Sequence, residues 1–343
     1  MTVQRSRDAL WRKRVFAFQS AWDAAREGDP AAVHQLRVAS RRVREALPVV
    51  SDGQRPYRVK RTGRKMRTLT RLLGPVRERD VCLLLLAGLE DEHPEDRSAI
   101  EAVREAVAAE RKNLHEELGR HLDSVNLEKL VKKLTRVAGH AKPPDGRQHR
   151  RSQKREASGE RKWQLAVAGR VVRRAKQLRQ AVEQAGALYA PDRLHGVRVF
   201  TKKLRYALEV GHESRLYRWQ PAIRTAKEMQ DILGQLQDRE VLIAHVRDVH
   251  VSHGDNSVSA ALDRLTRLLE DDTRRYHAQF VSRRDGLLKL CATVRQQASH
   301  AIPIGRPTPT RVALRPTQRV AAPRRPQVQG TPLPRVRAQP PVR

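Results

Sequence analysis

Cysteine, aromatic residues and acidic residues are all scarce in this chain of 343 residues. The two cysteines, Cys82 and Cys291, lie in apolar helical segments without the spacing of metal ligands, so we expect free buried thiols. Aromatic residues make up 4% of the chain, which leaves few rings on which nucleic-acid bases could stack. No apolar run reaches the roughly 18 residues of a membrane span, and no signal-peptide pattern is present. These absences favour a cytoplasmic protein without a membrane span, a metal or a cofactor.

Positive charge is abundant. Lysine and arginine number 70 against 38 aspartates and glutamates, which gives a formal net charge of +32. A charge of this size does not specify a fold, but it implies attraction to polyanions. The candidate partners at this point are nucleic acid, an acidic membrane surface and a phosphate polymer.

Apolar residues recur at three- and four-residue spacing along most of the chain, and strand patterns are nearly absent, which predicts an all-α fold. Two segments interrupt this pattern. Residues 138–160 are polar and rich in Pro, Gly and Arg, as expected of a basic flexible linker. Residues 303–343 contain ten prolines, nine arginines and no acid, which predicts a disordered tail. The predicted helical parts are therefore residues 5–137 and 161–298.

The two helical parts contain an internal repeat. The window HQLRVASRRVREAL begins at His34, and HGVRVFTKKLRYAL begins 161 positions later at His195. A proline precedes each histidine by four residues, as is typical of the first turn of a helix. A second landmark, LGPVRERDV at Leu73, returns as LGQLQDREV at Leu233. We predict that its glycine ends one helix and that the following acids begin the next.

Each repeated window places its basic residues on or beside one narrow stripe of the expected helix, next to an apolar face. These residues are His34, Arg37, Arg41, Arg42 and Arg44 in the first window and His195, Arg198, Lys202, Lys203 and Arg205 in the second. The helix before each LG landmark adds Arg64 and Arg67 in the first copy, and Arg224 and Lys227 in the second, where the pattern is weaker.

A single basic stripe is usually a solvated helix surface. Here, however, like charges at three- and four-residue spacing repel one another, and no acid interrupts either stripe. The arrangement also occurs twice, histidine included. We therefore interpret the stripes as an anion-binding surface, since arginine and lysine both suit phosphate oxygens.

The doubled pattern HxxRVxx[RK][RK]xR followed by LGxxx[ED] resembles the CHAD family, the conserved histidine α-helical domain. The resemblance covers about residues 5–294, and Glu78 stands where the family usually has aspartate. It implies two four-helix bundles related by pseudo-twofold symmetry around a basic central cleft. It also implies non-catalytic binding of inorganic polyphosphate, in many members at polyphosphate granules, with the residues of the two stripes and the two following helices as ligands.

Two alternative functions stay open. General nucleic-acid binding is one, because the linker and the tail would attract phosphates of DNA or RNA in any case. No helix-turn-helix, zinc-finger or RRM signature supports recognition of base sequence. An enzyme acting on phosphate polymers is the other, although the R-H-G signature of phosphohistidine enzymes and an ExExK motif are absent. The sequence does not reveal the oligomeric state, the polymer-length preference or the purpose of binding.

Overall fold

The computed structural model describes residues 3–51, 56–137, 149–252 and 256–300. They form α-helices and one short 3-10 helix, with no strand among them, so the all-α prediction is confirmed. The predicted tail, residues 303–343, and residues 138–148 of the predicted linker lie outside the described residues. Within that described part, no helix is both long and apolar enough to cross a membrane.

The helices up to residue 137 pack together as a first group. Helix α3 contacts α1, α2 and α4, and α6 packs against α1 and α4. The indole Nε1 of Trp11 in α1 donates a hydrogen bond of 3.0 Å to the carbonyl oxygen of Leu134 in α6. The elements are α1 (Val3–Ser20), α2 (Trp22–Glu27), α3 (Pro30–Val50), α4 (Pro56–Glu92), η1 (Pro94–Asp96), α5 (Arg97–Asp123) and α6 (Leu127–Val137).

The remaining described helices form a second group, in which each helix packs against the next and α10 also contacts α7. They are α7 (His149–Ala185), α8 (Pro191–Glu213), α9 (Gln220–Ser252) and α10 (Asn256–His300). Helix α7 begins inside the segment predicted to be a linker. The last proline of that segment is Pro144. From His149 onward the good helix formers Arg, Gln, Lys, Glu and Ala predominate.

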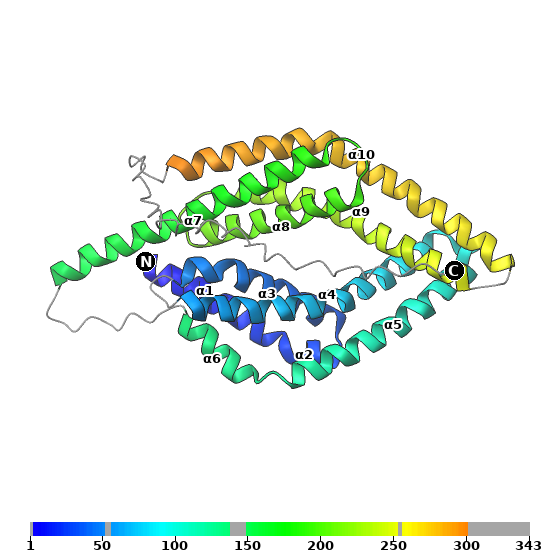
Figure 1. Cartoon of the computed structure of the whole chain (residues 1–343), viewed down its shortest axis with the longest axis horizontal. Coiled ribbons are helices and arrows are strands. Elements are labelled where there is room, and N and C mark those ends of the chain that lie inside the picture. Colours follow the sequence, from blue (N-terminus) through cyan, green and yellow to red (C-terminus); the bar gives the residue numbers. More distant parts are fainter. Residues whose placement is uncertain (1–2, 52–55, 138–148, 253–255, 301–343) are drawn as a thin grey trace, which may run out of the picture. The chain divides into compact units, whose positions relative to one another are not determined.

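Helices of the two groups lie side by side (Figure 1). The two groups also share a hydrophobic core. The larger core contains buried residues of both groups, such as Leu36 of α3 and Leu204 of α8. A second core joins α4 and α5 to α9 and α10, where Ile100 and Leu262 are fully buried. Burial of apolar surface between the groups therefore holds α3 next to α7 and α8. The pseudo-twofold internal repeat stays a prediction.

The LG landmarks lie inside helices, so the prediction that each glycine ends a helix is wrong. Helix α4 continues through Gly74 and Pro75, and α9 continues through Gly234. Pro75 cannot donate a backbone hydrogen bond, which normally weakens a helix. Its neighbours Leu73 and Val76 are both fully buried, and their packing keeps the helix intact at this point.

Gly211 of α8 lies close to the ring of Trp219, so a substitution at Gly211 tests the packing of the second group. A β-carbon at Gly211 would lie 2.4 Å from Cζ3 of Trp219. We expect Gly211→Ala to lower the free energy of unfolding by about 1–3 kcal/mol, because overpacking outweighs the higher helix propensity of alanine. Urea denaturation followed by circular dichroism measures the change.

Gly196→Ala on the same helix is the matched control. Nothing lies within 4 Å of a β-carbon at Gly196, so helix propensity alone should raise the free energy of unfolding by about 0.5–1 kcal/mol. Equal stabilisation by both substitutions would contradict the packing of Trp219 against α8.

Candidate functional site

The two repeated windows lie on α3 and α8, and each helix begins with a proline, Pro30 or Pro191. The carboxylate of Asp29 caps α3 by accepting a hydrogen bond of 2.6 Å from the backbone N–H of Ala32. The apolar faces of both helices are buried in the shared core. Because α3 and α8 contact each other, the basic stripes beside these faces are brought together.

The central cleft is a cavity of about 300 Å³ between α3, α4, α8 and α9. Its charged and histidine lining residues are His34, Arg37, Arg41, Arg77, Glu78, Arg198, Lys202, Asp231 and Asp238. The cleft therefore joins stripe residues of both windows.

Gly74, the glycine of the first LG landmark, also lines the central cleft. A β-carbon at this position would lie 2.9 Å from Nη1 of Arg37. The same guanidinium donates a hydrogen bond of 2.8 Å to the carbonyl oxygen of Thr70, one turn earlier on α4. The glycine thus leaves room for the Arg37 side chain against α4, which explains the landmark better than a helix end.

Burial and like charge act together on the cations of the central cleft. Burial, together with the charges of Arg198 and Arg41, lowers the pKa of Lys202 from 10.5 to about 6. Burial, and to a smaller extent the charges of Arg41 and Arg198, lowers the pKa of Arg37 to about 9, so this arginine is charged at neutral pH. The pKa of His34 is lowered by burial and then by Arg77. A bound anion would offset the cost of burying these cations and would neutralise the repulsion between them.

Acidic residues compensate the central cleft only in part. Oδ1 of Asp238 lies 3.4 Å from Nη2 of Arg198, while burial raises the pKa of this carboxyl against the opposing charges of Arg198 and Lys202. Lys202 itself has no hydrogen bond or ion pair within the described part of the chain. His195 does not line the cleft. It is exposed, with Nδ1 2.6 Å from Oε1 of Gln237.

Two of the predicted ligands, Arg42 and Arg205, contact the buried carboxylate of Glu209 instead of the central cleft. Nε of Arg42 lies 3.3 Å from Oε2 of Glu209. Nη1 of Arg205 donates a hydrogen bond of 2.6 Å to Oε1, and its Nε donates to Gln230 at 2.9 Å. Because Arg42 belongs to α3 and Glu209 to α8, this cluster connects the two stripe-bearing helices.

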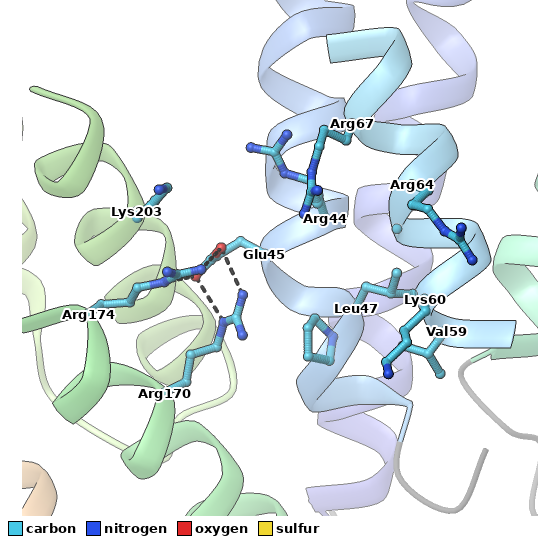
Figure 2. A pocket seen from close by; sticks show the side chains of 12 residues that line it. Arg44, Glu45, Leu47, Val59, Lys60, Arg64, Arg67, Arg170, Arg174 and Lys203 are labelled. Atoms are coloured by element: carbon cyan, nitrogen blue, oxygen red, sulfur yellow. Dashed lines mark hydrogen bonds and ion pairs between the residues drawn. The ribbon is translucent and has the colours of Figure 1, made fainter. Parts of the chain in front are cut away.

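A second cavity, the basic pocket, has a volume of about 800 Å³ and lies between α3, α4, α7 and α8 (Figure 2). Its charged lining residues are Arg44, Glu45, Lys60, Arg64, Arg67, Arg170, Arg174 and Lys203. Figure 2 shows Arg170, Arg174 and Lys203 on one wall, and Arg44, Arg64 and Arg67 on the other. Four predicted ligands, Arg44, Arg64, Arg67 and Lys203, are therefore gathered here.

Glu45 is the acid among the lining residues of the basic pocket, and two arginines of α7 bind it. Nε of Arg170 donates to Oε1 at 2.9 Å, and Arg174 donates to Oε1 at 2.8 Å and to Oε2 at 3.0 Å. Burial alone would raise the pKa of Glu45, but the hydrogen bonds from Arg174 and the charge of Arg170 outweigh it and hold the pKa below its ordinary value. Glu45 thus leaves no acceptor for the cations on the opposite wall.

Sequence reasoning missed Arg77, Arg170 and Arg174. The signal for the last two was their four-residue spacing on α7, which places them on one helix face. Conversely, the predicted ligands Arg224 and Lys227 are exposed on α9 and line neither the central cleft nor the basic pocket.

Both the sequence and the fold of this chain are similar to those of known proteins. A sequence model of the CHAD domain matches residues 9–247, and the chain belongs to the CHAD domain family. Among solved structures, it resembles the CHAD domain from the plant Ricinus communis, with a TM-score of 0.54 and 19% identity over 86% of this chain and 92% of that one. It also resembles PptA from Streptomyces chartreusis, with a TM-score of 0.51 and 14% identity over 88% and 100%. No curated protein matches the chain in sequence.

Substitution of Lys202 tests the desolvation of the central cleft. In the unfolded chain this lysine has its ordinary pKa of 10.5, whereas in the folded protein the pKa is about 6. Folding therefore releases a proton between these two pH values, and the destabilising effect of the residue diminishes as the pH rises from 6 to 10.5. We expect Lys202→Met to raise the Tm at pH 7 by about 2 °C or more and to weaken the pH dependence of stability in this range.

Lys227→Met removes an exposed lysine from α9 and should leave the Tm unchanged. Both variants are compared with the unsubstituted protein by calorimetry in dilute chloride buffer without phosphate, so that no phosphate neutralises the cleft. A lower Tm for Lys202→Met at pH 7 would contradict this prediction, because it would show that Lys202 stabilises the folded protein.

Proposed function

We propose that this protein binds inorganic polyphosphate in the central cleft and the basic pocket without catalysing a reaction. The observation that carries the proposal is the convergence of Arg37, Arg41, Arg198 and Lys202 on one cleft, where burial and mutual repulsion lower the pKa of Lys202 to about 6. A ligand with closely spaced negative charges would neutralise this cluster. Membership of the CHAD family supports the same ligand.

The chemistry of the linings favours a phosphate polymer over nucleic acid. Among the described residues, neither cavity is lined by phenylalanine, tyrosine or tryptophan, so the rings on which bases commonly stack are absent there. Guanidinium groups bind phosphate oxygens through paired hydrogen bonds, and lysine adds a point charge. Polyphosphate carries a negative charge on each phosphate and has no bases, so a row of cations is sufficient to bind it.

The linings also favour binding over group transfer. In the described part of the chain they contain no serine, threonine or cysteine that could act as a nucleophile, and Glu45 is occupied by Arg170 and Arg174. His34 would serve as a hydrogen-bond donor to phosphate. We further propose a cytoplasmic location at polyphosphate granules, where such a ligand is concentrated.

Neutralisation of two cleft cations tests the proposal. Arg41→Gln with Lys202→Gln should weaken binding of long-chain polyphosphate by about tenfold or more, because each residue makes a charge-assisted contact in a partly buried site. The dependence of log Kd on log salt should become shallower by about two units at most. Competition fluorescence anisotropy on the whole chain measures both quantities.

Arg224→Gln with Lys227→Gln is the control, since it removes the same charge from exposed positions outside both cavities. We expect less than a twofold change in affinity. An equal loss in both double variants would mean that total charge, not the cleft, determines binding. Displacement of polyphosphate by single-stranded DNA at equal phosphate concentration would favour the nucleic-acid alternative.

A further inference from the structure

A third cavity, the α4–α6 groove, has a volume of about 640 Å³ and lies between α4, α6 and the segment joining α5 to α6. Trp22, Met66, Leu69 and Leu130 form an apolar base and are buried. The rim carries His121 and the cations Arg61, Arg64, Lys65, Lys129 and Lys133, and no aspartate or glutamate is among the described residues that line the groove. The groove is thus a second cation-rich surface of the first helix group.

The fold of α6 directs two of these lysines towards the groove. Oδ1 of Asn126 accepts a hydrogen bond of 2.7 Å from the backbone N–H of Lys129 and so fixes the start of the helix. Lys129 and Lys133 are four residues apart and share one face, and both line the groove. Lys132, by contrast, is paired with Glu128 on another face of α6.

The cations of the groove have no partner among the residues that the structure describes. In the described residues, neither lysine side chain of the groove's α6 wall has a hydrogen bond or an ion pair, and the same holds for Arg61, Arg64 and Lys65 on α4. Each of these side chains is too exposed to bind a single phosphate tightly, since exposed ion pairs contribute little in water. They would add affinity only for an anion that is already held nearby.

Arg64 connects the groove to the basic pocket, because it lines both cavities. One turn before it, Lys60 lines the basic pocket and Arg61 lines the groove. A linear polyanion that leaves the basic pocket can therefore cross α4 at Arg64 and meet further cations on the other side.

We propose that polyphosphate continues from the basic pocket over Arg64 into the α4–α6 groove, which makes the groove an auxiliary subsite for long polymers. This inference rests on the proposed function and adds a length preference to it. Only chains long enough to reach from the basic pocket into the groove gain from Lys129 and Lys133. Trp22 is 3% exposed and presents no ring for a base to stack on, which favours a phosphate polymer over nucleic acid here as well.

Lys129→Gln with Lys133→Gln tests the subsite. We expect the affinity for long-chain polyphosphate to fall about three- to tenfold, and the affinity for tripolyphosphate to stay unchanged. The matched control is Lys132→Gln with Arg136→Gln, which removes the same charge from α6 but alters no residue that lines the groove. It should change neither affinity. Circular dichroism verifies that helicity is retained in all variants.

The outcomes separate this inference from the proposed function. If the groove variant binds long polymer as the control variant does, while Arg41→Gln with Lys202→Gln loses binding at both lengths, the subsite is wrong and the main site stands. If the cleft variant binds normally at both lengths, the proposed function itself fails. An equal loss of tripolyphosphate affinity in the groove variant, or an equal loss of affinity for single-stranded DNA, would also overturn the length-specific subsite.

Discussion

Mutual repulsion among the cations that α3 and α8 bring together is the constraint on which this structure depends. Burial lowers the pKa of Arg37, Arg198 and Lys202, and the charge of Arg41 lowers all three further. Helices that met only through such stripes would separate. Here the stripes run beside apolar faces that belong to a core shared by both helix groups, and burial of that core outweighs the repulsion.

Two buried carboxylates divide the basic residues of the stripes into two roles. Glu45 on α3 binds Arg170 and Arg174 on α7, whereas Glu209 on α8 binds Arg42 on α3. Each stripe-bearing helix thus supplies one acid to a basic residue of the other helix group. Arg42, Arg170 and Arg174 thereby join the groups, and removal of either acid would leave buried positive charge without compensation. The arginines and lysines of the two stripes that contact neither acid line the cavities and stay available to a ligand.

Helical periodicity was sufficient to predict the all-α fold and the cations that α3 and α8 place around the cleft, because stripe and apolar face follow from spacing alone. It could not predict the course of α4 through Pro75, which depends on the burial of Leu73 and Val76. Nor could it separate Arg37, which needs the space beside Gly74, from Arg42, which is bound to Glu209. Both distinctions depend on contacts between segments far apart in the sequence.

The cavities differ in how strongly they exclude water, and this difference determines how strongly each would hold the polymer. Lys202 and Arg37 in the central cleft are desolvated, whereas Arg64, Lys129 and Lys133 at the outer end are exposed. Charges in a partly buried site interact through a lower effective dielectric and are screened less by salt than exposed ones. A polymer held along this path would therefore be anchored at the cleft, and the outer contacts would weaken first as ionic strength rises. Because the outer cations are exposed and bind weakly alone, they would raise the affinity only for polymers that are long enough to reach them from the cleft.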